Sequence, residues 1–124
     1  MQRLQPSALK ELRAGLEGNL CTGCIERQLL ATDGSIFEVM PAAVVYPASA
    51  RDVIHTLSMA RRHGLSLHPR GAGSGLCGAT LGSGIVVDFT RHMNRLLALD
   101  TEQRVFVCQP GYRLGELDAA LAGA

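Results

Sequence analysis

A glycine-rich segment between two apolar runs constrains the fold of this chain more than any other feature. Six glycines lie between residues 71 and 84, inside the stretch SLHPRGAGSGLCGATLGSGIVVDF that extends from Ser66 to Phe89. Glycine disfavours helices and tolerates positive φ angles, so this density excludes a helix and predicts a shaped backbone loop. The flanking runs LSLHP and GIVVDF are short and apolar, which favours strands. The chain is therefore expected to hold this loop between two strands.

The residues before position 48 predict one helix and one strand. Residues 7–16 have an apolar helix face, whereas residues 17–41 show no period and are expected to be irregular. The stretch AAVVYP at 42–47 predicts a short strand that Pro47 ends. The apolar face of the first helix consists of Leu9, Leu12 and Leu16.

The stretch SARDVIHTLSMARRHG predicts a helix from residue 49 to residue 64. Ser49 can cap its start, with Asp52 three residues on as the acidic partner of a capping box. Gly64 ends it, after a basic last turn that suits the helix dipole. The expected buried stripe consists of Val53, Ile54, Leu57 and Ala60.

The C-terminal part predicts a hairpin followed by a short helix. RLLALD and RVFVCQP are two strand-like runs with a turn at residues 100–103. Val105 and Val107 then share one face of the second strand, with Phe106 and Cys108 on the other. The last helix carries Leu114, Leu117 and Leu121. Strand, helix and strand before the loop imply a right-handed parallel crossover. The expected fold class is α+β, with a small parallel sheet, flanking helices and a hairpin.

Length, composition and charge exclude several classes of protein. The 124 residues suffice for about one domain, and 47% hydrophobic with 19% charged residues argues against disorder. A net charge of +1 does not suggest a nucleic-acid partner. No apolar run reaches the roughly 18 residues that span a bilayer, and the polar start does not resemble a signal peptide. We therefore expect a cytoplasmic protein with free thiols and at most peripheral membrane contact.

The glycine loop itself favours an anion as its ligand. Gly73, Gly75 and Gly78 match G-x-G-x-x-G, but no helix follows and Asp88 comes too early for the dinucleotide-binding fingerprint. The Walker pattern fails because no lysine follows the last glycine. Successive backbone N–H groups in such turns form anion-binding nests, and Arg70 adds a positive charge at the entrance. A simple surface connection would need fewer glycines.

Cys21 and Cys24 form a C-x-x-C pair with several possible meanings. Such a pair can be a redox dithiol or half of a zinc or iron–sulfur site. A redox pair would follow a strand, which the preceding RAGLEGNL does not predict. A metal needs four ligands, and the other cysteines, Cys77 and Cys108, are not spaced as a second pair. Half of a metal site shared with another chain, a redox pair and no function all remain open, with the shared metal site favoured over the redox pair, and no metal ligand is assigned.

Taken together, these motifs resemble a known family. The capped helix, the P-R-G-x-G loop, VVDFTRHMNRLLALD and the QPG stretch are similar to FAD-linked oxidases of the vanillyl-alcohol-oxidase and para-cresol-methylhydroxylase (PCMH) type. Glycolate oxidase flavin subunits and D-lactate dehydrogenases belong to this group. The resemblance runs from Leu29 to the end of the chain. It implies the N-terminal half of a PCMH-type FAD-binding domain at residues 39–124, after a helical and irregular extension at 1–38.

The resemblance also implies a cofactor site. In this family the loop wraps the FAD pyrophosphate, and the matching contacts are Arg70, Gly71, Ala72, Gly73, Ser74, Gly75 and Leu76. Some members link FAD covalently through a histidine in the loop, whose position Ser74 occupies, so the flavin is expected to be noncovalent. His68 and Cys77 flank the loop outside that position.

No catalytic residue is assigned among Tyr46, Tyr112, His55, His63 and His92. The cluster Arg91, His92 and Arg95 is either a solvated turn or lies near a substrate or partner.

The implied activity is FAD-dependent oxidation of a 2-hydroxy acid of the lactate, glycolate or 2-hydroxyglutarate type. Related enzymes continue past Ala124 with the rest of the FAD domain and a substrate-binding cap. These parts, in the same or another chain, are the expected partners, and residues 1–124 alone are expected to be inactive. An iron–sulfur cluster would belong only to such a C-terminal region or to a partner. The alternative is a noncatalytic half-domain that acts as a flavin-binding or interaction module.

Overall fold

A four-stranded sheet forms the centre of the computed structural model, which describes residues 4–123. Its strands are β1 (Asn19–Cys21), β2 (Ala43–Tyr46), β3 (Leu67–Arg70) and β4 (Ile85–Asp88), in the order β1-β2-β4-β3. β4 pairs in parallel with both β2 and β3, whereas β1 pairs antiparallel with β2 at one edge. The expected α+β class with a small, mainly parallel sheet is confirmed.

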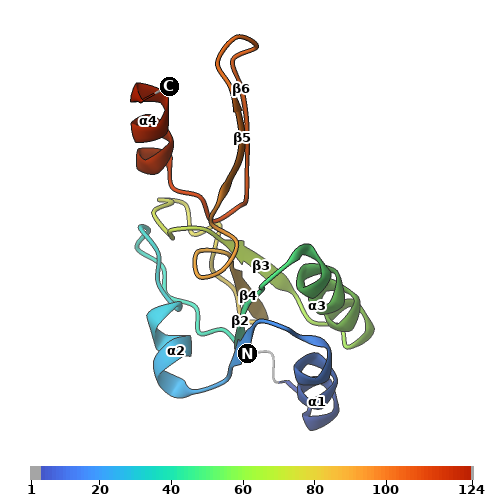
Figure 1. Ribbon diagram of the computed structural model, residues 1–124. Coiled ribbons are helices and arrows are strands. Elements are labelled where there is room, and N and C mark those ends of the chain that lie inside the picture. Colours follow the sequence, from blue (N-terminus) through green and yellow to red (C-terminus); the bar gives the residue numbers. More distant parts are fainter. Residues whose placement is uncertain (1–3, 124) are drawn as a thin grey trace.

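Two helices cover one face of this sheet and create the main core (Figure 1). α1 (Pro6–Gly15) and α3 (Ala50–Arg62) lie side by side. Strand residues alternate between faces, so Val45, Ile85 and Val87 point toward these helices. The core on this face consists of Ala8, Leu12, Val45, Met59, Ala60, Ile85, Val87, Phe89 and Met93.

The α3 helix is present as expected, but its predicted buried stripe is wrong in phase. Ile54 and Leu57 are 65% and 58% exposed, whereas Ala60 is buried and Val53 is partly buried. The buried side chains are Asp52, Thr56, Met59 and Ala60. Two polar residues therefore occupy the inner face, and each has its own hydrogen bonds. The Thr56 hydroxyl donates to the Asp52 carbonyl at 2.7 Å.

The predicted capping box at the start of α3 is also wrong. Ser49 is the N-cap residue, but its hydroxyl makes no side-chain capping bond, and its Oγ is buried without a partner among residues 4–123. Asp52 instead accepts hydrogen bonds from the backbone amides of Glu17, Gly18 and Ala48, at 3.0, 2.8 and 2.8 Å. The carboxylate therefore joins the segment after α1 to the start of α3.

Residues 17–41 are more ordered than their sequence predicted. They contain β1 and the short helix α2 (Cys24–Leu29), which has no buried residue. Thr32 and Glu38 then form an isolated antiparallel bridge. The pairing of β1 with β2 crosses the expected boundary between 1–38 and 39–124, and that boundary stays a prediction.

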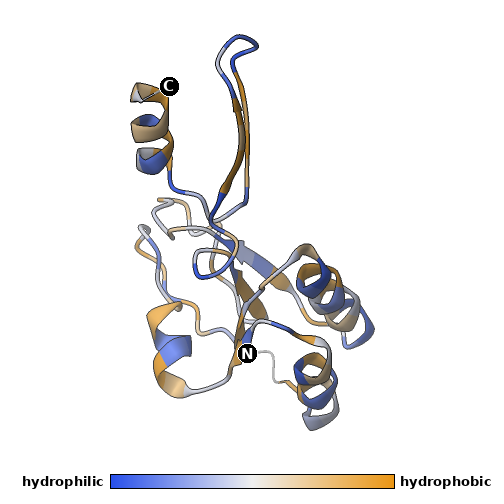
Figure 2. Ribbon diagram, viewed as in Figure 1, coloured by the Kyte–Doolittle hydropathy of each residue, from blue (hydrophilic) through white to orange (hydrophobic). Residues whose placement is uncertain are grey.

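The hairpin and the last helix agree with the sequence. β5 (Leu96–Asp100) and β6 (Val105–Cys108) pair antiparallel, and α4 spans Leu114–Ala122. They extend away from the four-stranded sheet (Figure 1), and the ribbon of both strands is hydrophobic with a hydrophilic tip (Figure 2). On α4 only Leu117 is buried. Among the described residues, no helix is long and apolar enough to cross a membrane.

Candidate functional site

The glycine loop begins where β3 ends. Phe89 donates a backbone hydrogen bond to the Arg70 carbonyl at 3.1 Å, which prolongs the pairing of β3 with β4 up to the loop. The loop therefore leaves from the carboxyl end of a parallel strand, the end at which parallel sheets usually bind their ligands. From there it returns to Ile85, the first residue of β4.

The first half of the loop presents backbone donors that have no partner in the described chain. The amides of residues 72–77 donate to no acceptor within residues 4–123. Ala72 and residues 74–77 are exposed, so these N–H groups are open to solvent or to a ligand. Gly73 has a φ of +68°, which turns the chain as an anion-binding nest requires. The local backbone therefore suits a group with several acceptor oxygens.

Two glycines of the loop serve different purposes. A Cβ on Gly73 would overlap the Arg70 guanidinium, and the positive φ is itself unfavourable for other residues. A Cβ on Gly75 would meet nothing within 4 Å. Gly73 is thus required by the fold of the loop, whereas the bare backbone of Gly75 leaves space that a ligand can occupy.

Arg70 is a structural support of the loop. Its side chain is only 8% exposed, and its Nη1 donates to the Thr32 carbonyl at 2.9 Å. The positive charge of Arg70 therefore lies next to the loop as expected, but burial and this hydrogen bond hold the guanidinium beneath Gly73.

The TDGS stretch at residues 32–35 clamps the loop, a role that the sequence did not reveal. The Gly34 amide donates to the Gly73 carbonyl at 2.9 Å. Asp33 accepts from the Ser35 amide at 2.9 Å and from the Thr80 hydroxyl at 3.0 Å. Hydrogen bonds from the Ser35 side chain and backbone, followed by that from Thr80, lower the pKa of Asp33. The Asp–Gly–Ser turn signal was visible, but its contact with residue 73 depends on the tertiary fold.

The histidines do not gather at the loop. His55 Nε2 lies 3.2 Å from the carbonyls of Glu11 and Leu12, and His63 pairs with the Glu11 carboxylate at 2.9 Å. His68 contacts the Ser66 hydroxyl at 3.0 Å. His55 and His63 connect α3 to α1, whereas the contact of His68 is local, and the structure brings none of the three together as a catalytic group.

The residues after β4 also have internal partners. The Arg91 guanidinium lies 3.7 Å from the centre of the Tyr46 ring, and His92 Nε2 lies 2.7 Å from the Asn19 side-chain oxygen. Burial raises the pKa of Tyr46, against the opposing effect of Arg91. Arg95 is exposed and does not join this pair. The expected cluster of Arg91, His92 and Arg95 is thus divided, and two of its members brace the ends of β1 and β2.

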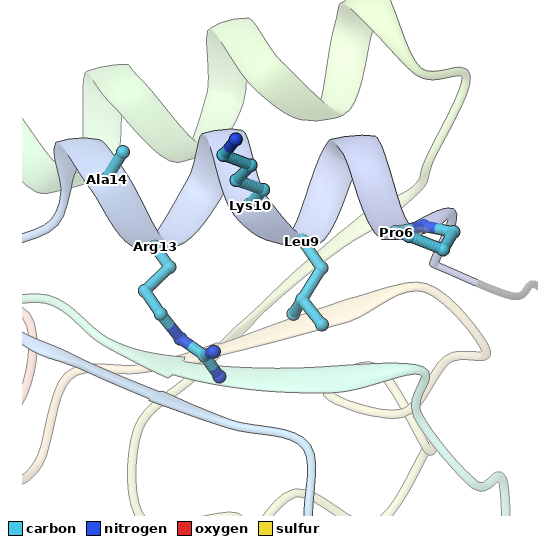
Figure 3. Close-up of a pocket in the computed structure, with 5 residues that line it drawn as sticks. All are labelled: Pro6, Leu9, Lys10, Arg13 and Ala14. Carbon is cyan, nitrogen blue, oxygen red and sulfur yellow. The ribbon is translucent and has the colours of Figure 1, made fainter.

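Other possible sites are weaker. Within residues 4–123, no three His, Cys, Asp or Glu side chains are placed to hold a metal ion. A hollow of about 500 Å³ lies beside α1, and all five of its lining residues belong to that helix. Figure 3 shows Leu9 and Arg13 on the same side of the helix. A single helix with few polar groups is a poor frame for a cofactor, so the loop remains the principal candidate.

Comparison with known families decides what kind of domain this is. Residues 41–124 match the FAD binding domain family. The chain belongs to this family. The sequence resemblance is thereby confirmed, as is FAD as the cofactor of the domain.

Several relatives of this FAD binding domain are oxidoreductases. The chain is 39% identical over 120 residues to D-2-hydroxyglutarate dehydrogenase of Pseudomonas putida, covering 94% of this chain and 12% of that protein. It is 35% identical over 77 residues to glycolate oxidase subunit GlcD of Bacillus subtilis, covering 60% and 16%. The chain therefore spans only a small part of the relatives that it matches.

Solved flavoenzyme structures share the fold of this domain. Alkyldihydroxyacetonephosphate synthase superimposes with a TM-score of 0.84 at 22% identity, over 98% of this chain and 25% of that one. Physcomitrella patens BBE-like 1 gives a TM-score of 0.76 at 24% identity, over 94% and 26%. These likenesses confirm the expected PCMH-type architecture.

Proposed function

We propose that residues 70–76 hold the pyrophosphate of FAD. Support comes from the unpartnered amides of residues 72–77 in a chain that belongs to the FAD binding domain family. Pyrophosphate oxygens are strong acceptors, and a nest of N–H groups compensates their charge without a lysine. This run of open amides is the single observation that carries the proposal.

Each residue of this proposed site has its own role. The amides of Gly71, Ala72, Ser74, Gly75 and Leu76 donate to phosphate oxygens. Gly73 supplies the turn, and Arg70 positions the turn from below. The Ser74 hydroxyl adds a donor and leaves the flavin noncovalent. Flavin that stays with acid-precipitated protein would contradict this last assignment.

The whole protein is proposed to be an oxidoreductase acting on a 2-hydroxy acid. Relatives named D-2-hydroxyglutarate dehydrogenase and glycolate oxidase support this substrate class. Bound FAD supplies the hydride acceptor. This chain's own part is to bind and orient the cofactor, while the base and the substrate pocket belong to the remainder of the enzyme. Reduction of a dye by D-2-hydroxyglutarate, D-lactate or glycolate, measured on the protein from its own cells, tests this activity.

The proposed partner of residues 1–124 is the rest of the FAD domain with its substrate cap. Support comes from the exposed apolar hairpin, where Leu97, Val105 and Val107 are 58%, 52% and 50% exposed. If no hydroxy acid reduces the dye but FAD still binds, the alternative of a noncatalytic flavin-binding module is favoured.

The decisive experiment on the site compares two glycine substitutions that the fold tolerates equally. Gly75→Ala places a methyl group where phosphate would approach, and Gly115→Ala places one on α4. Neither new Cβ would meet an atom within 4 Å. In the native protein we expect Gly75→Ala to weaken FAD binding about tenfold, or ~1.4 kcal/mol, by flavin fluorescence titration. Gly115→Ala serves as the control. Equal FAD affinity in both variants would refute the loop as the pyrophosphate site.

A further inference from the structure

The C-x-x-C pair lies at a junction between a strand and a helix. Cys21 is the last residue of β1, and Cys24 is the first residue of α2. The sequence argued against a redox pair because no strand was predicted before it. The structure removes that objection, since β1 pairs with β2 along its whole length. Reversible dithiols of the C-x-x-C type also lie between a strand and a helix, although here β1 is antiparallel to β2.

The two thiols differ in accessibility, as an attacking and a resolving thiol do. Cys24 is exposed and Cys21 is partly buried, and both are free. Within residues 4–123 no third and fourth metal ligands gather beside them, so this part of the chain does not complete a metal site. The pair is therefore better suited to thiol–disulfide exchange than to metal binding.

We propose that Cys21 and Cys24 form a reversible intramolecular disulfide with low-molecular-weight disulfides as the oxidant. The Cys24 thiolate attacks one sulfur of the oxidant and releases one thiol, which leaves a mixed disulfide on Cys24. Cys21 loses its proton and attacks the Cys24 sulfur, and the second thiol leaves. The protein thereby loses two hydrogens, and the oxidant gains two electrons and two protons.

The surroundings of the turn set the consequence of this exchange. α2 has no buried residue, and Arg27 fastens it by a 2.6 Å hydrogen bond to the Pro41 carbonyl. A disulfide would add a covalent link between this helix and the edge strand β1.

The test is an equilibrium incubation of the native protein with glutathione disulfide, followed by alkylation and mass spectrometry. Both cysteines fall in tryptic peptide 14–27, which contains no other cysteine. We expect this peptide to lose two hydrogens and to carry no glutathione. Hydrogen exchange in residues 24–29 should then slow down in the oxidised protein.

Matched variants separate this proposal from its alternatives. Cys21→Ser should retain glutathione on Cys24, because the resolving thiol is gone. Cys77→Ser should still form the intramolecular disulfide, because Cys77 lies in the glycine loop. Stable glutathione on Cys24 of the unaltered protein, no oxidation of peptide 14–27, or disulfide-linked dimers would overturn the proposal. So would stoichiometric zinc that protects both thiols.

Discussion

The Asp52 carboxylate joins segments that are distant in the sequence. It is fully buried and accepts hydrogen bonds from the amides of Glu17, Gly18 and Ala48. Burial raises the pKa of Asp52, but these three hydrogen bonds together lower it more, and its pKa lies below the ordinary value. The ionised form is therefore the one that stabilises the fold.

Replacing Asp52 with Asn should destabilise the protein by about 1.5–3 kcal/mol, the usual range for a lost charged hydrogen bond. The amide keeps one acceptor oxygen and cannot serve all three donors. Urea unfolding at neutral pH measures the loss. Asp118→Asn on the exposed face of α4 is the control and should stay within about 0.5 kcal/mol of the parent. Equal effects of the two substitutions would contradict the assigned role of Asp52.

The same carboxylate predicts how stability depends on pH. Its pKa is lower in the folded chain than in the unfolded chain, where it lies near 3.9. Its contribution is therefore complete above about pH 4 and is lost as the pH falls through the folded pKa. Urea midpoints measured from neutral to acid pH should decline more steeply for the parent than for Asp52→Asn. Parallel curves would argue against the linkage.

At the scale of elements, α3 shows which of its faces packs against the sheet. Met59 is fully buried in the core, whereas Leu57, two positions earlier, is 58% exposed. Hydropathy alone ranks both as core candidates. Asp52 faces inward because its carboxylate accepts hydrogen bonds from amides outside the helix, and the Thr56 hydroxyl beside it is satisfied by the Asp52 carbonyl within the helix.

This orientation predicts opposite outcomes for two similar truncations in α3. Met59→Ala removes buried methylene groups and should cost about 2–5 kcal/mol of unfolding free energy. Leu57→Ala should change it by no more than about 0.5 kcal/mol. Thermal and urea unfolding of both variants provide the measurement. A larger loss for Leu57→Ala would mean that α3 is rotated from the orientation described.

At the scale of the whole molecule, the hairpin has apolar side chains that its own chain leaves exposed. Val105 and Phe106, on opposite faces of β6, are 52% and 46% exposed. A two-stranded hairpin is only marginally stable in water without a surface to cover it. Hollows of about 290 and 170 Å³ lie between the hairpin and α4. These features support the proposed partner surface.

Residues 1–124 produced alone should therefore self-associate through the hairpin. Phe106→Glu should shift sedimentation toward the monomer, because it places a charge on an apolar strand. Ile54→Glu, on the exposed face of α3, is the matched control and should leave association unchanged. A monomeric parent at high concentration, or equal shifts in both variants, would contradict the proposed partner surface.

Particular residues show which parts of the fold and of the site could be predicted from the sequence. Residues 43–46 and 85–88 were recognisable as strands because continuous apolar runs mark buried strands. Asp100 to Gln103 were recognisable as a turn because polar residues separate two apolar runs. β1 and α2 were missed because three-residue and six-residue elements are too short to display a period. The open amides after Arg70 were foreseeable from glycine density. The clamp from Gly34 to Gly73 joins residues far apart in sequence, and no local pattern encodes it.

The sequence by itself determined the order of the major elements, the glycine loop and the FAD binding domain family. The element order and the loop depend on local backbone preference and on apolar periodicity, which short windows of sequence contain, whereas the family followed from the resemblance of several motifs taken together. Only the tertiary structure decided that Arg70 supports the loop from beneath, that Asp52 holds three amides, and that Cys21 ends a strand. Each of these depends on which distant groups become neighbours when the sheet buries its faces. Hydrogen bonds of buried polar groups select among those arrangements, because leaving such groups unpaired is costly.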